Sequence, residues 1–299
     1  MSSVNPGSVR AIAKKDFQDA VRSWLFWGLS VFFFFIIVGL GALVGYLEDE
    51  FSTEALISIL SQSTRLIIPV IAIVLGWKAI AGERESGSIK VLLSLPHSRR
   101  DVILGKLLGR SAVLTVSLVI GFLLAGAVVG IMIGSFAIGD FLGLLAISII
   151  YGIAYTSIAV SISSLTRSTT VAAAAGFFVF ALFYIIWNIM IIGLDMLRMQ
   201  GYISGVEYTF TANGNRFQTE RLPDWALFIN NIDPGNAFAN ALTLTTEASG
   251  LEGAGMVQDR AFADGIPFFL QDWFSFVVLL LWIVLPVVVA LLWFDRTDL

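Results

Sequence analysis

The chain has 299 residues, of which 57% are apolar and 13% are charged, with a mean hydropathy of +0.87. Soluble globular domains carry about 25% charged residues, so this composition excludes that class and predicts a protein of the bilayer. The sequence has no cysteine and one histidine, His97, which excludes disulfides and thiolate chemistry and limits any His-based triad or metal cluster to one imidazole. We therefore expect a protein that is not an enzyme, with no catalytic, cofactor or metal site of its own.

Residues 1–23 carry an amphipathic pattern. Apolar residues recur at three- and four-residue spacing, and basic and polar residues occupy the other positions. The apolar set is Val9, Ile12, Ala13, Phe17, Ala20, Val21 and Trp24, and the polar set is Arg10, Lys14, Lys15, Gln18 and Arg22. This spacing predicts a helix that lies along the inner membrane surface. A merely basic leader that fixes topology is the alternative, and only the charge supports it.

Six apolar runs are long enough to cross a hydrocarbon core, which needs roughly 20 residues of helix. They cover residues 24–46, 63–81, 113–136, 141–165, 171–194 and 274–294. Because backbone polar groups in lipid must be satisfied within their own segment, these runs predict helices. The expected fold is an all-α integral membrane protein, with spans one to five in residues 24–194 and the sixth span and a tail in residues 273–299.

The basic residues predict the orientation of these spans. Placing both termini in the cytoplasm puts 13 of the 18 Lys and Arg residues on the inner side, where basic residues are retained. We therefore expect a multi-pass cell-membrane protein with cytoplasmic N- and C-termini. On this assignment Arg65 lies at the outer interface, and Lys78 extends its amine to the inner one.

Residues 82–110 form a charged, helix-prone segment between spans two and three. Its first residues have the spacing G-x-x-x-x-G, but Ser88 stands where a nucleotide-binding loop needs lysine, so this route to ATP is absent. The triplet Glu83, Arg84 and Glu85 lies at the cytoplasmic mouth of span two.

The rest of this segment predicts two helices separated by a break. The first carries the apolar residues Ile89, Leu92, Leu93 and Leu95 and is ended by Pro96. The second begins with Ser98 as its N-cap and Asp101 at N3, and it continues into span three. An apolar ridge rimmed by charge fits a groove on a partner protein. An ordinary positive loop whose leucines dip into lipid is the alternative.

Residues 195–272 form the longest segment between two spans, and we expect it to lie outside the cell. Within residues 223–245, two helical patterns flank a turn signal, Asp233-Pro234-Gly235. We expect helices packed on the outer face of the bundle. Residues 211–215 and 249–255 are rich in turn-forming residues.

The pattern E-R-E-x-G-x-I-K-x-L-L-x-L-P-x-S-R-x-D-V-x-x-G-K, which covers residues 83–106, resembles the cytoplasmic loop of ABC type-2 exporter permeases. These include the copper-processing permeases linked to nitrous-oxide reductase maturation. The six spans, the N-terminal helix and the large segment before the last span also resemble that family, although this outer segment is long for it.

The resemblance implies that the chain pairs with a second permease subunit, identical or related, and with two separate cytosolic ATPase subunits that bind ATP and Mg. We expect contact with membrane lipid and no nucleic-acid partner. The resemblance assigns ATPase coupling to Ile89, Lys90, Leu92, Leu93, Leu95, Pro96, Ser98, Arg99 and Arg100. It assigns a cytoplasmic gate to Glu83, Arg84 and Glu85. The implied function is an ATP-driven exporter. The alternative is a membrane anchor or mechanical transmitter that uses the ATPase to act on an external protein.

Polar side chains within the spans are few. Asn188, Thr156 and Ser157 are candidates for a substrate path, but such groups in membrane helices more often bond to a carbonyl four residues earlier. The glycines Gly126, Gly130 and Gly134 on span three and Gly41 and Gly45 on span one predict close helix packing, either within one subunit or at a dimer seam. The four phenylalanines at 32–35 face lipid or, at a seam, an apolar path suited to lipid-like or amphipathic cargo.

Overall fold

The computed structural model describes residues 4–47, 53–88, 98–133, 137–212, 215–246, 261–262 and 265–294. These residues are mostly helical, and six helices are long and apolar enough to cross a membrane. They cover Phe26–Leu43, Leu56–Glu85, Arg99–Ile131, Ile138–Leu165, Thr169–Met199 and Asp272–Trp293. The six predicted spans are thereby confirmed.

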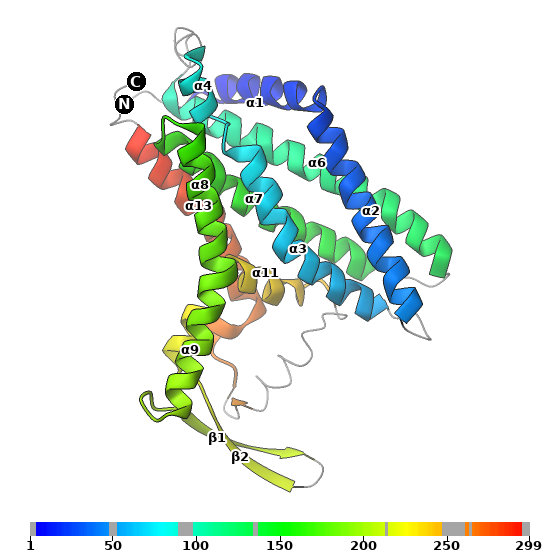
Figure 1. Ribbon diagram of the computed structural model, residues 1–299, viewed down its shortest axis with the longest axis vertical. Helices are drawn as coiled ribbons and strands as arrows, with labels where there is room; N and C mark the ends of the chain where they lie inside the picture. The colour runs from blue at the N-terminus through cyan, green and yellow to red at the C-terminus, as the bar shows by residue number, and fades with distance from the viewer. Residues whose placement is uncertain are drawn as a thin grey trace.

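Helix α1 (Pro6–Val21) crosses the top of the bundle and leads into α2 (Trp24–Leu47), which runs down one side (Figure 1). The sequence starts α1 at a defined place, because Pro6 occupies N1 and Asn5 caps the helix. The Asn5 side-chain oxygen accepts hydrogen bonds from the backbone N–H groups of Gly7 and Ser8, at 2.9 and 3.4 Å. The predicted N-terminal helix is confirmed, and its place on a membrane surface stays a prediction.

Span two is built from α3 (Thr53–Gly76) and the short α4 (Ala81–Glu85), with a break over residues 77–80. Helix α3 begins ten residues before the predicted span, so Arg65 lies well inside the helix. Span three belongs to α6 (Arg99–Ile133), which at 35 residues is about 52 Å long. That length exceeds a hydrocarbon core of about 30 Å. The first turns of α6 lie beside α1.

Helix α7 (Ile138–Leu165) is the central element, because it packs against α3, α6, α11 and α13. Span five follows as α8 (Thr169–Ala181), a π-helical turn η1 (Leu182–Ile186) and α9 (Trp187–Met199). This helix descends along the edge of the bundle toward the bottom of Figure 1. Only 6% of its most apolar window is buried inside the chain, which leaves its sides to lipid or to another subunit.

The segment between spans five and six contains a two-stranded antiparallel hairpin that the sequence reading missed. Strands β1 (Val206–Ala212) and β2 (Asn215–Arg221) pair with Phe210 opposite Phe217, and these rings stack 5.5 Å apart. Alternating aromatic and polar residues across an Asn-Gly turn are the usual hairpin signal. The expectation of an entirely helical fold is therefore wrong at this hairpin.

Among the described residues, two helices and a short turn follow the hairpin before the last span. They are α10 (Asp224–Asn231), α11 (Pro234–Leu242) and the 3-10 turn η2 (Phe268–Leu270), followed by α13 (Asp272–Phe294). The predicted pair of helices is confirmed, but Asp233-Pro234-Gly235 starts α11, with Asp233 as N-cap and Pro234 at N1. Helix α11 packs between α3, α7 and α13. Residues 249–255 lie outside the described part of the chain.

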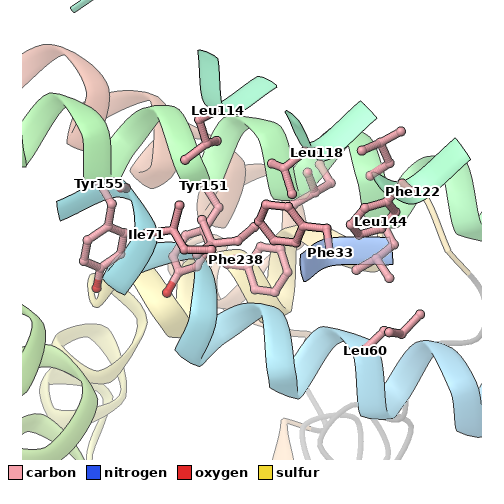
Figure 2. Close-up of a cluster of buried hydrophobic side chains, with 14 of the residues drawn as sticks. Phe33, Leu60, Ile71, Leu114, Leu118, Phe122, Leu144, Tyr151, Tyr155 and Phe238 are labelled. Carbon is pink, nitrogen blue, oxygen red and sulfur yellow. The ribbon is translucent and has the colours of Figure 1, made fainter. Parts of the chain in front are cut away.

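The largest core joins six helices, because α13 contributes Val278 and Leu279 to it. Figure 2 shows side chains of α2, α3, α6, α7 and α11 packed together, including Phe33, Leu60, Leu118, Tyr151 and Phe238. Because α11 contributes a ring to this core, the segment after span five is anchored inside the bundle.

Two of the glycines that predict close helix packing make such contacts within the subunit, and a dimer seam stays a prediction. A Cβ on Gly41 would stand 3.1 Å from Val129, and one on Gly126 would stand 2.8 Å from Phe141, so both glycines serve packing within the subunit. A Cβ on Gly130 would meet nothing within 4 Å among the described residues. Gly134 lies outside the described residues.

Candidate functional site

Helices α1, α4 and α6 approach one another at the top of Figure 1. Four charged side chains of these helices are in contact. The Lys106 amine lies 2.9 Å from Asp16 of α1 and 2.6 Å from Glu83 of α4. The Arg110 guanidinium lies 3.0 Å from the other oxygen of Asp16. We call Asp16, Glu83, Lys106 and Arg110 the charge cluster. It has two cations and two anions, so each buried charge is compensated.

The cluster is well shielded from water. The Asp16 side chain is 4% exposed, and the Lys106 side chain is 11% exposed. Ion pairs in such a place are screened far less by salt than surface pairs. The cluster therefore ties α4, which precedes the predicted coupling residues, to both α1 and α6.

Two glycines let α1 approach α6 closely enough for these contacts. A Cβ on Gly105 would stand 2.7 Å from Ile12, and one on Gly109 would stand 2.8 Å from Asp16. Their four-residue spacing places both on one face of α6, the small-x-x-x-small arrangement of tightly packed helices. Asp16 thus lies on the buried face of α1, next to Ile12, rather than on its polar face.

The remaining two residues of the predicted gate bind a different part of the bundle. The Arg84 guanidinium donates to the Thr166 carbonyl at 2.9 Å, at the end of α7. The Glu85 carboxylate accepts from the Thr169 N–H at 3.0 Å, at the first residue of α8. A carboxylate is favourable there because the helix N-terminus carries unpaired N–H groups and partial positive charge. Glu83, Arg84 and Glu85 therefore connect α4 to three other helices.

Ser163 of α7 stabilises the break between α3 and α4. Its hydroxyl accepts from the N–H groups of Ile80 and Ala81, at 3.0 and 2.9 Å, and donates to the Trp77 carbonyl at 2.7 Å. These are backbone groups that the interrupted helix leaves without their regular partners. One side chain thus holds the junction between α3 and α4.

The start of α6 has the predicted capping box. The Asp101 N–H donates to the Ser98 hydroxyl at 3.1 Å, and the Ser98 N–H donates to the Asp101 carboxylate at 2.9 Å. The other Asp101 oxygen accepts from the Asn5 N–H at 2.9 Å, which joins the beginnings of α1 and α6. Arg99 and Arg100 are half-buried in this first turn.

Most of the predicted coupling residues lie outside the described part of the chain. These are Ile89, Lys90, Leu92, Leu93, Leu95 and Pro96. The structure does place both flanks of this segment, since α4 and the capped start of α6 belong to one packed assembly with α1.

The three candidates for a substrate path bond to backbone carbonyls. Thr156 donates to Gly152 and Asn188 to Tyr184, each at 2.8 Å and each four residues earlier. Ser157 donates to the Ile283 carbonyl at 2.6 Å, in the turn before Pro286, where proline disturbs the helix ladder. These are the bonds that a structural role predicts, and a role in a path stays a prediction.

The sequence reading missed Asp16, Lys106 and Arg110 as a connected set, and it missed Ser163. The G-x-x-x-G spacing at Gly105 was a usable signal for close packing. No comparable signal existed for Ser163, because a serine in a membrane helix usually bonds within its own helix. Among the described residues, no group of three Asp, Glu or His side chains is placed to hold a metal ion.

Comparison with known proteins identifies the family. The model for ABC-2 family transporter proteins matches residues 10–299, nearly the whole chain. The chain belongs to the ABC-2 transporter family. It is an ABC-2 permease subunit and a multi-pass membrane protein, and permeases of this family are not themselves ATPases but work with ATPase partner subunits.

Two curated relatives are similar to part of the ABC-2 permease. One is the probable ABC transporter permease protein NosY of Stutzerimonas stutzeri, which is 33% identical over 114 residues, 37% of this chain and 41% of the relative. The other is the probable ABC transporter permease protein NosY of Pseudomonas aeruginosa PAO1, which is 32% identical over 117 residues, 38% of this chain and 42% of the relative. The match spans about two fifths of the length of these relatives.

Proposed function

We propose that this permease subunit converts ATP-driven movement of separate cytosolic ATPase subunits into rearrangement of its membrane helices, and thereby exports a substrate. The carrying observation is the position of α4: it lies between α3 and the predicted coupling residues, and it is bonded to α6, α7 and α8. A push on residues 89–100 reaches these helices through side chains that are already engaged.

The route of this movement follows from the contacts. Glu83 meets Lys106 of α6, Arg84 meets the end of α7, and Glu85 meets the start of α8. Because helices are stiff along their axes and ion pairs are replaceable, such a junction has more than one arrangement of comparable energy. ATP binding to the partner selects one arrangement only if the partner contacts the two arrangements differently.

The assembly that we propose has two such permease subunits, identical or related, and two ATPases, with lipid around the spans and no nucleic acid. Both termini, α1 and the charge cluster lie on the cytoplasmic side, as the basic residues favour. The external segment is residues 195–272. ATP and Mg bind to the ATPases, and this chain binds neither.

The proposed cargo is lipid-like or amphipathic. The first span supports this class, because Phe32 and Phe35 are 43% and 66% exposed and present an apolar surface. The second candidate function is a non-transporting anchor that transmits ATPase movement to an external protein. The hairpin β1–β2 favours it, because this ribbon extends away from the bundle (Figure 1).

Charge removal at α4 tests the proposal in the complete complex. We expect Glu83→Gln to leave co-purification of the ATPase unchanged and to reduce the stimulation of its activity by the permease. Glu207→Gln, on the exposed hairpin, is the matched control and leaves both unchanged. Full stimulation in Glu83→Gln would show that the proposed route is wrong. Movement of labelled lipid in proteoliposomes separates export from the anchor function.

A further inference from the structure

Arg65 of α3 joins three helices at the far side of the bundle from the charge cluster. Its guanidinium donates to the Asn236 side-chain oxygen at 2.5 Å and lies 3.6 Å from the Asp233 carboxylate, and both partners belong to the start of α11. Gly235 leaves room for this contact, since a Cβ there would stand 3.0 Å from the arginine Nε.

The backbone of Arg65 is engaged as well. Pro69 has no N–H, so the Arg65 carbonyl four residues earlier loses its helical partner. The Tyr151 hydroxyl of α7 donates to this carbonyl at 3.1 Å, and the Tyr151 ring stacks on Phe238 of α11 at 4.7 Å (Figure 2). The position where α3 is weakened by proline is thus the position where it holds α11.

Asp233 is a buried carboxylate whose two oxygens are not equally satisfied by hydrogen bonds. One carboxylate oxygen accepts from the Asn236 N–H at 2.7 Å, as the N-cap of α11. The other oxygen is buried and makes no hydrogen bond among the described residues, and the residue is 1% exposed. A buried carboxylate with an unsatisfied oxygen favours any arrangement that lets water reach it.

We propose that α11 is a plug in the outer half of the bundle, which Arg65 latches shut through Asp233 and Asn236 and which the ionised Asp233 biases toward release. When α3 bends or shifts at Pro69, the guanidinium leaves Asp233, and solvation of the carboxylate favours movement of α11 out of the bundle. The inference rests on the proposed function for its place in transport, but the latch itself is testable without the ATPase.

The charges that surround Asp233 support this direction. Among the described residues, the ionisable groups that act on it are Arg65 of α3 and Tyr151 and Tyr155 of α7. Burial raises the pKa of Asp233 to about 6, and this exceeds the opposing effects of its N-cap hydrogen bond and of Arg65. Burial therefore makes the charged form of Asp233 less stable in the bundle than in water, although the carboxylate still predominates at neutral pH.

Thiol labelling of the full chain in proteoliposomes tests the latch. The sequence has no cysteine, so Ala237→Cys introduces a single thiol at a buried position of α11. A membrane-impermeant maleimide then measures how often α11 opens to water. In this background we expect Arg65→Gln to accelerate labelling about tenfold, which corresponds to the loss of one charge-assisted contact. We expect Asp233→Asn, which keeps an N-cap side chain, to slow labelling below the background rate.

Opposite responses distinguish a latch from a general loss of folding. Damage to the fold accelerates labelling in both variants, whereas the latch predicts that the double variant Arg65→Gln/Asp233→Asn returns close to the background rate. Arg65→Lys retains the charge and restores slow labelling, and Arg216→Gln on the exposed hairpin is the control. Acceleration in Asp233→Asn, or an unchanged rate in Arg65→Gln, overturns the latch. Neither result bears on ATPase coupling, so this inference fails independently of the proposed function.

Discussion

Lys106 is the residue of the charge cluster whose removal has the clearest consequence. Its amine contacts Asp16 of α1 and Glu83 of α4, so Lys106→Met keeps much of the side-chain volume and removes the only cation that touches both among the described residues. Asp16 retains Arg110 at 3.0 Å, and the Glu83 side chain is 24% exposed and can turn toward water. The tie between α1 and α4 is lost, while Asp16 keeps Arg110 as its partner and Glu83 keeps some access to water.

The expected cost follows from these partners. Breaking a fully buried pair costs about 3–5 kcal/mol, and here both carboxylates retain partial compensation. We therefore expect about 2 kcal/mol, the loss of one strong hydrogen bond to a charged group. For a chain of this size that lowers the melting temperature by roughly 4–8 °C. Glu83→Gln removes a more exposed charge and costs about 1 kcal/mol.

The assay is thermal unfolding of the purified permease for both single variants and the double variant, together with ATPase stimulation in the complex. Because the double variant removes both charges of the Lys106–Glu83 pair, it should be less destabilised than the two single variants together, by about 1 kcal/mol or more. Additive costs would refute the direct contact between Lys106 and Glu83. Unchanged ATPase stimulation in Lys106→Met would refute its part in coupling.

Three further predictions test other contacts. Gly105→Ala forces α1 away from α6 and should cost about 1–3 kcal/mol in thermal unfolding, whereas Gly130→Ala on the same helix has free space and should be neutral or slightly stabilising. Ser163→Ala leaves backbone groups at the α3–α4 break unpaired and should cost about 1–3 kcal/mol in thermal unfolding. The control Ser161→Ala removes a hydroxyl that makes no hydrogen bond among the described residues, so it should be close to neutral. As the pH falls through about 6, labelling of the α11 cysteine should slow more steeply with Asp233 present than in Asp233→Asn, and this comparison cancels the lower reactivity of any thiol at low pH. The reason is that the Asp233 pKa is raised from 3.8 to about 6, so proton uptake favours the buried state by up to about 3 kcal/mol. A smaller slowing with Asp233 than in Asp233→Asn would contradict the sign.

The spans were predictable because a hydrophobic stretch of bilayer length has few alternatives to a helix. The capping box of Ser98 and Asp101 was predictable for a similar reason, since the residues that satisfy a helix start lie within one turn of it. The hairpin was missed although Asn213-Gly214 is a strong turn signal. The surrounding helical patterns were extended over a segment that has alternating aromatic and polar residues.

Contacts between helices were the part that the sequence did not reveal. Asp16 and Lys106 are 90 residues apart, and nothing in either neighbourhood identifies the other as its partner. The sequence predicted that Arg65 lies at the outer interface. The structure places it inside α3, which begins ten residues before the predicted span, and next to α11, which returns into the bundle. Both features depend on tertiary packing, which the sequence pattern does not show. Proline gave a partial signal, since Pro69 frees a carbonyl that some side chain has to satisfy, but only the structure shows that it is Tyr151.

The proposed function requires that residues 82–110 couple this permease to an ATPase. Co-purification of the tagged chain from its native membrane, with mass spectrometry and an ATPase assay of the eluate, is the measurement for this coupling. We expect a stoichiometric ATPase subunit with the unaltered chain, and loss of its stimulation with Leu92→Asp while membrane insertion is unchanged. A folded chain that repeatedly purifies without an ATPase, or a Leu92→Asp variant that stimulates the ATPase fully, would contradict it.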